Sequence, residues 1–366
     1  MKHLRFGYGI SFFLVLGLSA LWRTVPLAGV ERASQDNQFV GSDQCVACHA
    51  GIANVQSTSN HSITVRRVEK LKDLGKAVPL HFSDRANGVE YRLETSTSPN
   101  RFLDLVALKD EREERLGLLW GFGAGRKGIT FLGRAKNGDY GQSLLSWYRK
   151  TNSLDVTTGL EKKVKDSHDA LADWMTLPQR EHCFNCHVTR EAEAAPETMN
   201  EKDVGIRCER CHGAGQKHIQ AVTTKKRGPG LAIRNPGKLK AIEQLYFCGA
   251  CHGIPPGSTA VYTISRNMAD PRIVRYPAQR LVLSRCYTET PGNLNCTSCH
   301  NPHENLPQSV QYFDSKCKSC HRTQGPAPSC SAASKDCVQC HMPRATGFMT
   351  HSDFADHWIR RIISDL

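Results

Sequence analysis

The 366-residue sequence has few of the side chains that normally fill a protein core. Only 39% of its residues are hydrophobic and only 7% are aromatic. A chain of this length is nevertheless long enough for two or three domains. We therefore expect a second source of apolar material in the core, one that the amino acids do not supply.

Cysteine, by contrast, is abundant, and its spacing is regular. Fourteen of the sixteen cysteines form seven Cys-x-x-Cys pairs, and each pair is followed directly by histidine. In chain order the sites are Cys45, Cys48, His49 (site 1); Cys183, Cys186, His187 (site 2); Cys208, Cys211, His212 (site 3); Cys248, Cys251, His252 (site 4); Cys296, Cys299, His300 (site 5); Cys317, Cys320, His321 (site 6); and Cys337, Cys340, His341 (site 7).

The histidine after each pair separates haem attachment from the other uses of Cys-x-x-Cys, which are zinc ribbons and redox dithiols. About one residue in twenty is histidine, so seven such histidines would arise by chance with odds on the order of one in a billion. Residues three and four apart share one face of a helical turn, so two thiols can reach the vinyl groups of a porphyrin while the histidine meets the iron. The sequence therefore predicts seven covalent haems c.

The N-terminus is consistent with this chemistry, because haem c is attached outside the cytoplasm. Lys2 and Arg5 precede an apolar run over residues 6–22, the layout of an export signal. No clear A-x-A cleavage site follows, and the run is near the lower length limit for a span, so residues 1–30 are expected to be a signal peptide or an N-terminal anchor. No cysteine follows the run, which argues against a lipid anchor. We expect a location in the periplasm or on the outer face of the cytoplasmic membrane.

The formal net charge of +13 raises the question of a nucleic-acid partner, with the basic residues 225–227 as its patch. Seven haems would bring about fourteen propionates, which roughly cancels that charge, and an exported protein rarely meets nucleic acid. We therefore expect no nucleic-acid binding. The expected partners are redox proteins or quinol-linked membrane enzymes, with membrane attachment through the N-terminal segment as an open option.

The uneven spacing of the sites suggests the domain organisation. Six of them lie between residues 183 and 341, so the porphyrins must pack against each other. We expect a mainly α and irregular, haem-packed cytochrome core with a small antiparallel β segment inserted after the first site. The expected parts are an N-terminal segment (1–30), the first haem site (40–77), the β-rich segment (78–150) and a six-haem domain (151–366).

Two shorter stretches also carry structural predictions. Residues 123–128 match the G-x-G-x-x-G dinucleotide fingerprint, but a β-branched stretch follows them where the fingerprint needs a helix. A glycine-rich hairpin turn is therefore preferred. At the C-terminus, apolar residues four apart over 354–366 predict an amphipathic helix with Ser352 or Asp353 as its N-cap.

Histidines outside the motifs decide what each haem can do. A second axial histidine gives a closed electron carrier, whereas an open position permits substrate chemistry. Apart from His3, the eight available donors are His61, His81, His168, His182, His218, His303, His351 and His357. His218 and His303 follow a motif histidine by six and three residues, so each is tethered to the wrong side of its own haem. We expect both to bind the iron of a neighbouring haem.

The stretch CERCHGAGQKH resembles an element of the multihaem cytochromes c that include hydroxylamine oxidoreductase, pentahaem nitrite reductase and a tetrahaem cytochrome c. CTSCHNPHE resembles doubled-CxxCH cytochromes, and CVQCHMPR with HSDFADHWIRR resembles exported multihaem cytochromes often joined to TPR repeats. The resemblance implies His61, His218, His303, His351 and His357 as distal ligands. His168 and His182 complete the candidate set. All seven motifs end in histidine, whereas nitrite reductases of this kind carry a CxxCK site, so that activity is not expected.

Two functions fit these observations. The first is a heptahaem electron-transfer cytochrome with bis-histidine haems. The number of extra histidines favours it, because eight are enough to give each of the seven irons a second axial ligand. The alternative is an oxidoreductase acting on a small nitrogen or sulfur compound at one open haem. The two remaining cysteines, Cys286 and Cys330, would lie in an oxidising compartment, where either a disulfide or two buried free thiols fits.

Overall fold

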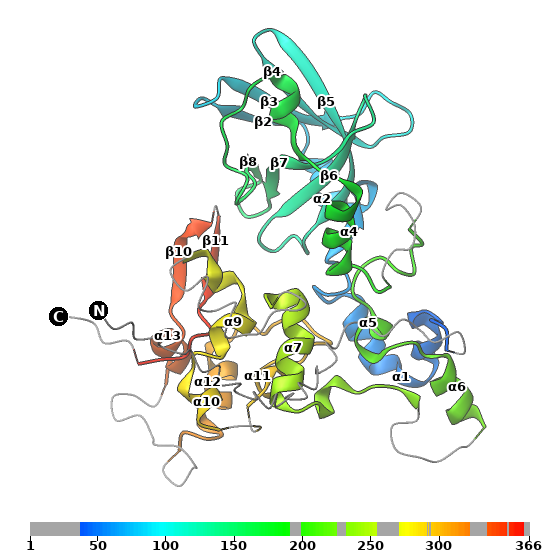
Figure 1. Ribbon diagram of the computed structural model, residues 1–366, viewed down its shortest axis with the longest axis vertical. Coiled ribbons are helices and arrows are strands. Elements are labelled where there is room, and N and C mark those ends of the chain that lie inside the picture. Colours follow the sequence, from blue (N-terminus) through cyan, green and yellow to red (C-terminus); the bar gives the residue numbers. More distant parts are fainter. Residues whose placement is uncertain are drawn as a thin grey trace, which may run out of the picture.

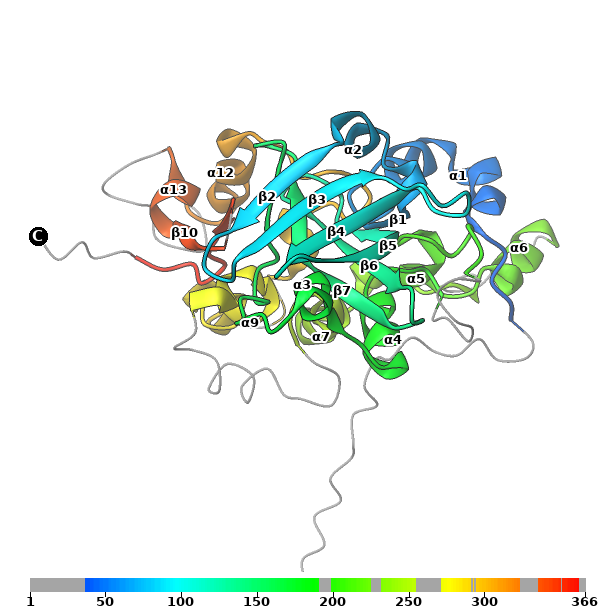
Figure 2. The same ribbon diagram turned by 90° about the horizontal axis from the view of Figure 1, so that it is seen from above.

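The computed structural model describes residues 37–190, 199–224, 232–254, 271–290, 292, 294–322, 335–349 and 351–361. A large antiparallel sheet forms one part of the molecule, and short helices that carry the Cys-x-x-Cys-His sites lie below it in Figure 1. Viewed from above, the sheet lies over the helices (Figure 2). None of the helices within these ranges is long and apolar enough to cross a membrane.

The sheet contains nine strands, and all of its pairings are antiparallel. The strands are β1 (Val65–Arg67), β2 (Leu80–Asp84), β3 (Val89–Thr95), β4 (Leu103–Lys109), β5 (Arg112–Phe122), β6 (Ile129–Ala135), β7 (Tyr140–Tyr148), β8 (Ser153–Val156) and β9 (Ala172–Trp174). Strands β2 to β8 follow one another in chain order, while β1 pairs with β5 and β9 pairs with β7. Strand β2 also approaches β8, so the sheet is nearly closed.

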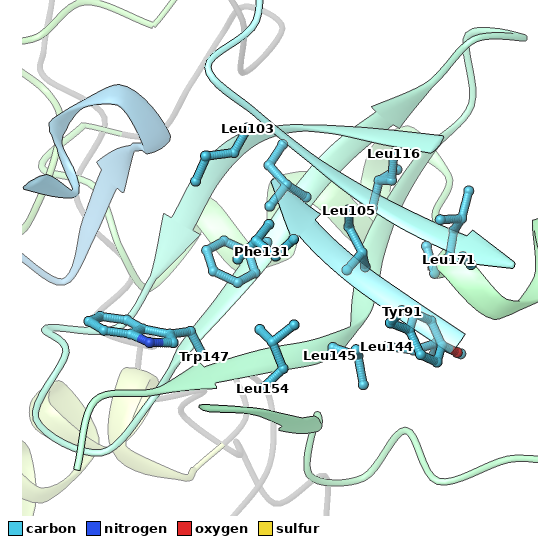
Figure 3. Close-up of a cluster of buried hydrophobic side chains, with 14 of the residues drawn as sticks. Tyr91, Leu103, Leu105, Leu116, Phe131, Leu144, Leu145, Trp147, Leu154 and Leu171 are labelled. Carbon is cyan, nitrogen blue, oxygen red and sulfur yellow. The ribbon is translucent and has the colours of Figure 1, made fainter. Parts of the chain in front are cut away.

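The inner face of this sheet encloses the largest hydrophobic cluster of the described residues (Figure 3). On β3, the alternating residues Val89, Tyr91 and Leu93 are at most 2% exposed, as the period of a half-buried strand requires. Leu105 and Phe131 from β4 and β6 complete the packing. The Tyr91 hydroxyl donates a hydrogen bond of 3.0 Å to a backbone carbonyl, which satisfies its polar group inside the core.

The expectation of a mainly α fold with a small β segment is therefore wrong. The sheet is the dominant element; it begins before residue 78 at β1 and continues beyond residue 150 into β8 and β9. These three strands are only three or four residues long, too short for an alternating pattern to reveal them. The physical reason for the error is that the sheet builds its own side-chain core and does not depend on porphyrin for apolar material.

The helices are short, and most of them carry a haem motif. They are α1 (Ser42–Ser57), α2 (Lys72–Ala77), α3 (Ser167–Leu171), α4 (Leu177–Asn185), α5 (Cys208–His212), α6 (Gln216–Thr223), α7 (Ala241–His252), α9 (Pro277–Leu281), α10 (Arg285–Thr288), α11 (Cys296–Cys299), α12 (Val310–Lys318) and α13 (Cys337–His341). Apart from α1, which has 16 residues, these helices have at most 12 residues and are too short to be stable alone, so packing and caps must hold them. Asn295, for example, caps α11 by accepting from the backbone N–H of Ser298 at 2.9 Å.

Two local predictions have opposite outcomes. Residues 123–128 join β5 to β6, so the glycine-rich turn is confirmed. The C-terminal amphipathic helix is wrong, because strands β10 (Arg344–Met349) and β11 (Ser352–Ala355) form a two-stranded sheet there. Within the described residues, 356–361 follow β11 without forming a helix. The N-terminal segment 1–30 and Cys330 lie outside the described residues.

Candidate haem sites

Four motif histidines each lie opposite one histidine from another part of the chain. The ring centroids are 6.4 Å apart for His49 and His218, 6.0 Å for His252 and His61, 5.9 Å for His212 and His303, and 6.1 Å for His300 and His357. Sites 1, 3, 4 and 5 thus each have one of the extra histidines opposite their motif histidine. His218 and His303 both lie opposite the motif histidine of a different site from the one they follow.

This spacing fits an iron atom between each pair of rings. An imidazole nitrogen binds a first-row metal at about 2.0–2.1 Å, so two rings on opposite sides of one iron have centroids roughly 6 Å apart. Directly stacked rings would lie closer, as His168 and Trp174 do at 4.2 Å. The residues present therefore fit bis-histidine haem at sites 1, 3, 4 and 5.

Hydrogen bonds at the second ring nitrogen orient three of these histidines. Nδ1 of His61 lies 3.1 Å from the carbonyl oxygen of Pro302, that of His212 lies 2.9 Å from Arg234 O, and that of His357 lies 3.1 Å from Ala355 O. Carbonyl oxygens only accept, so Nδ1 carries the proton in each case. This tautomer leaves the lone pair on Nε2, the nitrogen that would bind iron, as in other metal sites where a second hydrogen bond fixes the ligand.

The environment also keeps two of these imidazoles, those of His252 and His357, neutral. Desolvation by the surrounding chain lowers the pKa of His252 to about 4, and the nearby His61 adds to the effect. Desolvation likewise lowers the pKa of His357 to about 4. Only the neutral ring has a free nitrogen lone pair, so both groups are ready to bind a metal at neutral pH.

Sites 2, 6 and 7 have different surroundings. His187 of site 2 is half-buried, with Nδ1 2.8 Å from the hydroxyl oxygen of Thr64 and its ring edge-on to Phe122 at 5.2 Å between centroids. His341 of site 7 has Nδ1 3.0 Å from the carbonyl oxygen of Arg360. His321 of site 6 is exposed. All histidines except His3 lie in the described residues, and no second histidine ring lies against His187 among them.

The other candidate ligands lie away from these pairs. His351 lies against Tyr148, and its Nε2 is 3.0 Å from a carboxylate oxygen of Asp155. His168 stacks on Trp174 at the sheet. His182 is exposed in α4, directly before the motif of site 2, and His81 is exposed on β2. Iron binding by His168, His182 and His351 stays a prediction.

Sequence reasoning missed the residues that hold these histidines in place. Thr64 belongs to no motif, and nothing in the sequence distinguishes it from other threonines. Asn301, whose Oδ1 lies 3.2 Å from Nδ1 of His303, could have been found, because it lies between His300 and His303 in the motif region. Glu209 is another: it is 3% exposed and accepts from the backbone N–H groups of Val40, Gly41 and Gly215, which joins the first described residues to site 3.

A buried ion pair holds the segment that carries His357. Asp356 is 4% exposed and accepts from Nε of Arg280 at 2.7 Å and from Arg360 at 2.7 Å. Burial by itself raises the pKa of Asp356, but the hydrogen bonds from Arg280, the Trp358 backbone and Arg360 outweigh it and lower the pKa. The carboxylate is thus bound in its charged form directly beside a candidate iron ligand.

We expect Asp356→Asn to lower the free energy of unfolding by about 1.5–3 kcal/mol, because a buried charged hydrogen bond is lost. Since the folded-state pKa of Asp356 is lowered, this contribution is present above the carboxyl's ordinary pKa of 3.8 and is lost as the pH falls through the lower folded value. Chemical denaturation at pH 7 and pH 3 measures both effects. Asp353→Asn is the control: its pairs with Lys127 and Arg344 are exposed, so about 1 kcal/mol or less is expected. Equal losses of unfolding free energy in both variants would contradict a stabilising role of the buried Asp356 ion pair.

Comparison with known proteins supports the haem interpretation. The family described as cytochrome c554 and c-prime matches residues 142–213, a stretch that contains sites 2 and 3. The crystal structure of the outer cell wall cytochrome OcwA is similar in fold, with a TM-score of 0.51 and 16% sequence identity, over 88% of this chain and 79% of that one. No curated protein sequence matches the chain. The family match, the fold and the seven motifs together support a multihaem cytochrome c with an electron-transfer role.

Proposed function

We propose that this protein is an exported c-type cytochrome with seven haems, which passes electrons one at a time between redox protein partners. The observation that carries the proposal is the set of four histidine pairs with ring centroids 5.9–6.4 Å apart. Haem iron held by two histidines cycles between its ferrous and ferric forms and supplies one-electron transfer. Such closed sites favour a carrier over a catalyst.

The protein's own residues would keep these sites closed and at low potential. At sites 3, 4 and 5 one imidazole of each pair has its tautomer fixed by a carbonyl oxygen, so its Nε2 would bind the iron. The second histidine of each pair would take the remaining axial position and leave none for a substrate. The similarity to an outer cell wall cytochrome supports export, as the basic and apolar N-terminal segment does. The electron donor would be a redox protein or a quinol-linked membrane enzyme.

The first test of this proposal is the haem count. The intact mass of the purified protein should exceed that of its polypeptide by seven haem masses, and elemental analysis should find seven irons and no zinc. A variant with Cys337→Ala and Cys340→Ala should lose one haem mass, because its site 7 has no thiols for attachment. Fewer than seven haems in the parent protein would contradict the proposal.

One observation favours the alternative, an oxidoreductase acting on a small nitrogen or sulfur compound. His187 of site 2 lies against Phe122 and Thr64, and no second histidine ring lies against it in the described part of the chain. An iron held there by one histidine could bind a small molecule. Carbon monoxide binding by the reduced parent protein separates the functions: a carrier closed at every site binds none, whereas an open site 2 binds one equivalent.

A further inference from the structure

The motifs of different sites contact each other in a consistent pattern. Helix α1 of site 1 packs against helix α5 of site 3, and the thiols of Cys45 and Cys208 lie beside each other there. The sulfur of Cys186 in site 2 lies 4.0 Å from the carbonyl oxygen of Ala250 in the motif of site 4. Helix α7 of site 4 in turn packs against helix α11 of site 5. Since the thiols of each motif would bond to a porphyrin edge, sites whose motifs meet must hold neighbouring haems.

Contacts between the helices extend this series at sites 3 and 4. Arg234 donates from Nε to the carbonyl oxygen of Cys211 at 3.2 Å, and its guanidinium lies over the ring of Phe247 in α7 at 4.9 Å. This side chain therefore joins site 3 to the helix of site 4. From α7, Gln244 accepts from the backbone N–H of Thr297 in α11 at 3.0 Å, which supports the contact between sites 4 and 5.

The same reasoning orders the last three sites. Helices α11 and α12, which carry sites 5 and 6, pack together. Asp314 of α12 is 3% exposed and accepts from the backbone N–H groups of Asp336 and Val338 at 2.6 and 3.2 Å, so it fixes the start of α13, the helix of site 7. Sites 6 and 7 are thus neighbours, held by a buried carboxylate.

From these contacts we infer that the sites form one row in the order 1, 3, 4, 5, 6, 7. Site 2 lies beside this row at sites 3 and 4, because Arg210 of site 3 also donates to the carbonyl oxygen of Asn185 in site 2. Figures 1 and 2 agree: α1, α5, α7, α12 and α13 follow one another across the molecule, and α4 stands between this row and the sheet in Figure 1. Site 4, like site 3, then has three neighbours, whereas sites 1 and 7 are ends with one neighbour each. This order rests on the proposed function, because it concerns bound haems.

The order can be tested by changing the potential of one site and observing the others. Methionine in place of an axial histidine raises the potential, so the altered site is reduced first. The electron that it then carries makes reduction of an adjacent site harder, an effect that weakens with distance and screening. We expect His61→Met, at site 4, to lower the midpoint potentials of three other haems. His218→Met, at site 1, should lower only one.

Potentiometric titration followed by the resolved NMR signals of the haem methyl groups counts the shifted haems. Equal numbers of shifted haems in the two variants, or more in His218→Met, would overturn the order. Intact mass separates the two claims: fewer than seven haems in the parent contradicts the proposed function, whereas seven haems with another pattern of shifts contradicts only the order.

If a variant does not retain its haems, anomalous diffraction at the iron edge from crystals of the parent protein decides. The two irons nearest to that of site 2 must then be those of sites 3 and 4, and any other nearest iron overturns this placement of site 2.

Discussion

Replacing His218 by alanine is expected to convert the iron of one of the seven proposed haems from low spin to high spin. In the structure the His218 ring lies 6.4 Å from that of His49, the separation of two rings on one iron. Alanine offers no nitrogen, so the iron of site 1 would lose one axial ligand while Cys45, Cys48 and His49 still hold the haem. Electron paramagnetic resonance of the oxidised variant should show a new high-spin signal from about one seventh of the iron. The reduced variant should bind one equivalent of carbon monoxide more than the parent protein.

His81→Ala is the matched control for this experiment. His81 is exposed on β2, opposite Arg92 of β3, and belongs to none of the four ring pairs. Its replacement should leave both the spin state and carbon monoxide binding unchanged. An unaltered low-spin spectrum in His218→Ala would show that His218 is no ligand, and the bis-histidine interpretation of the other three pairs would lose its basis in ring spacing.

The sequence was most informative where chemistry fixes the spacing of residues. Two thiols and a histidine at a fixed spacing predict all seven sites, and the structure places each of these motifs in or at the end of a helix. The short chain distance between two histidines also predicted a ligand pairing. His218 is only six residues from His212, too close to reach the opposite face of the same haem, and the structure places it against His49.

The rest depended on contacts between distant segments, which local patterns do not encode. His351 follows a haem motif as His218 does, yet its Nε2 lies against Asp155, almost two hundred residues earlier in the chain. The sheet was underestimated for a related reason. Strand β1 has three residues and pairs with β5 from far along the chain, so its existence follows from tertiary pairing and not from alternation.

Gly205, just before site 3, shows how such a distant contact supports a site. Its φ of 79° lies in the left-handed region, which favours glycine. A Cβ atom there would lie only 1.9 Å from the carbonyl oxygen of Ser62, so the two backbones approach more closely than any side chain allows. The neighbouring Ile206 donates its N–H to the carbonyl oxygen of His61 at 2.9 Å, and Gln56 donates to Ile206 O at 2.7 Å. The segment before site 3 thus holds the backbone of His61, the candidate ligand of site 4.

We therefore expect Gly205→Ala to lower the free energy of unfolding by about 2–5 kcal/mol. Left-handed backbone costs about 1–2 kcal/mol for a residue with a Cβ atom, and overpacking against a fixed backbone adds about 1–3 kcal/mol. Because Ser62 must move and His61 precedes it, the variant should also weaken the axial bond at site 4 and produce a partial high-spin signal. Denaturant unfolding and electron paramagnetic resonance measure the two effects.

Gly159→Ala separates backbone strain from the close approach. Gly159 has a φ of 88°, but no atom lies within 4 Å of a Cβ atom built there. Only the strain of about 1–2 kcal/mol remains, and the spin state should be unchanged. If both variants lose the same stability and keep low-spin iron, the contact between Gly205 and Ser62 does not position His61. A larger loss of stability in Gly205→Ala, with high-spin iron in that variant alone, would instead show that a glycine in the segment leading into one haem motif determines the axial ligation of another.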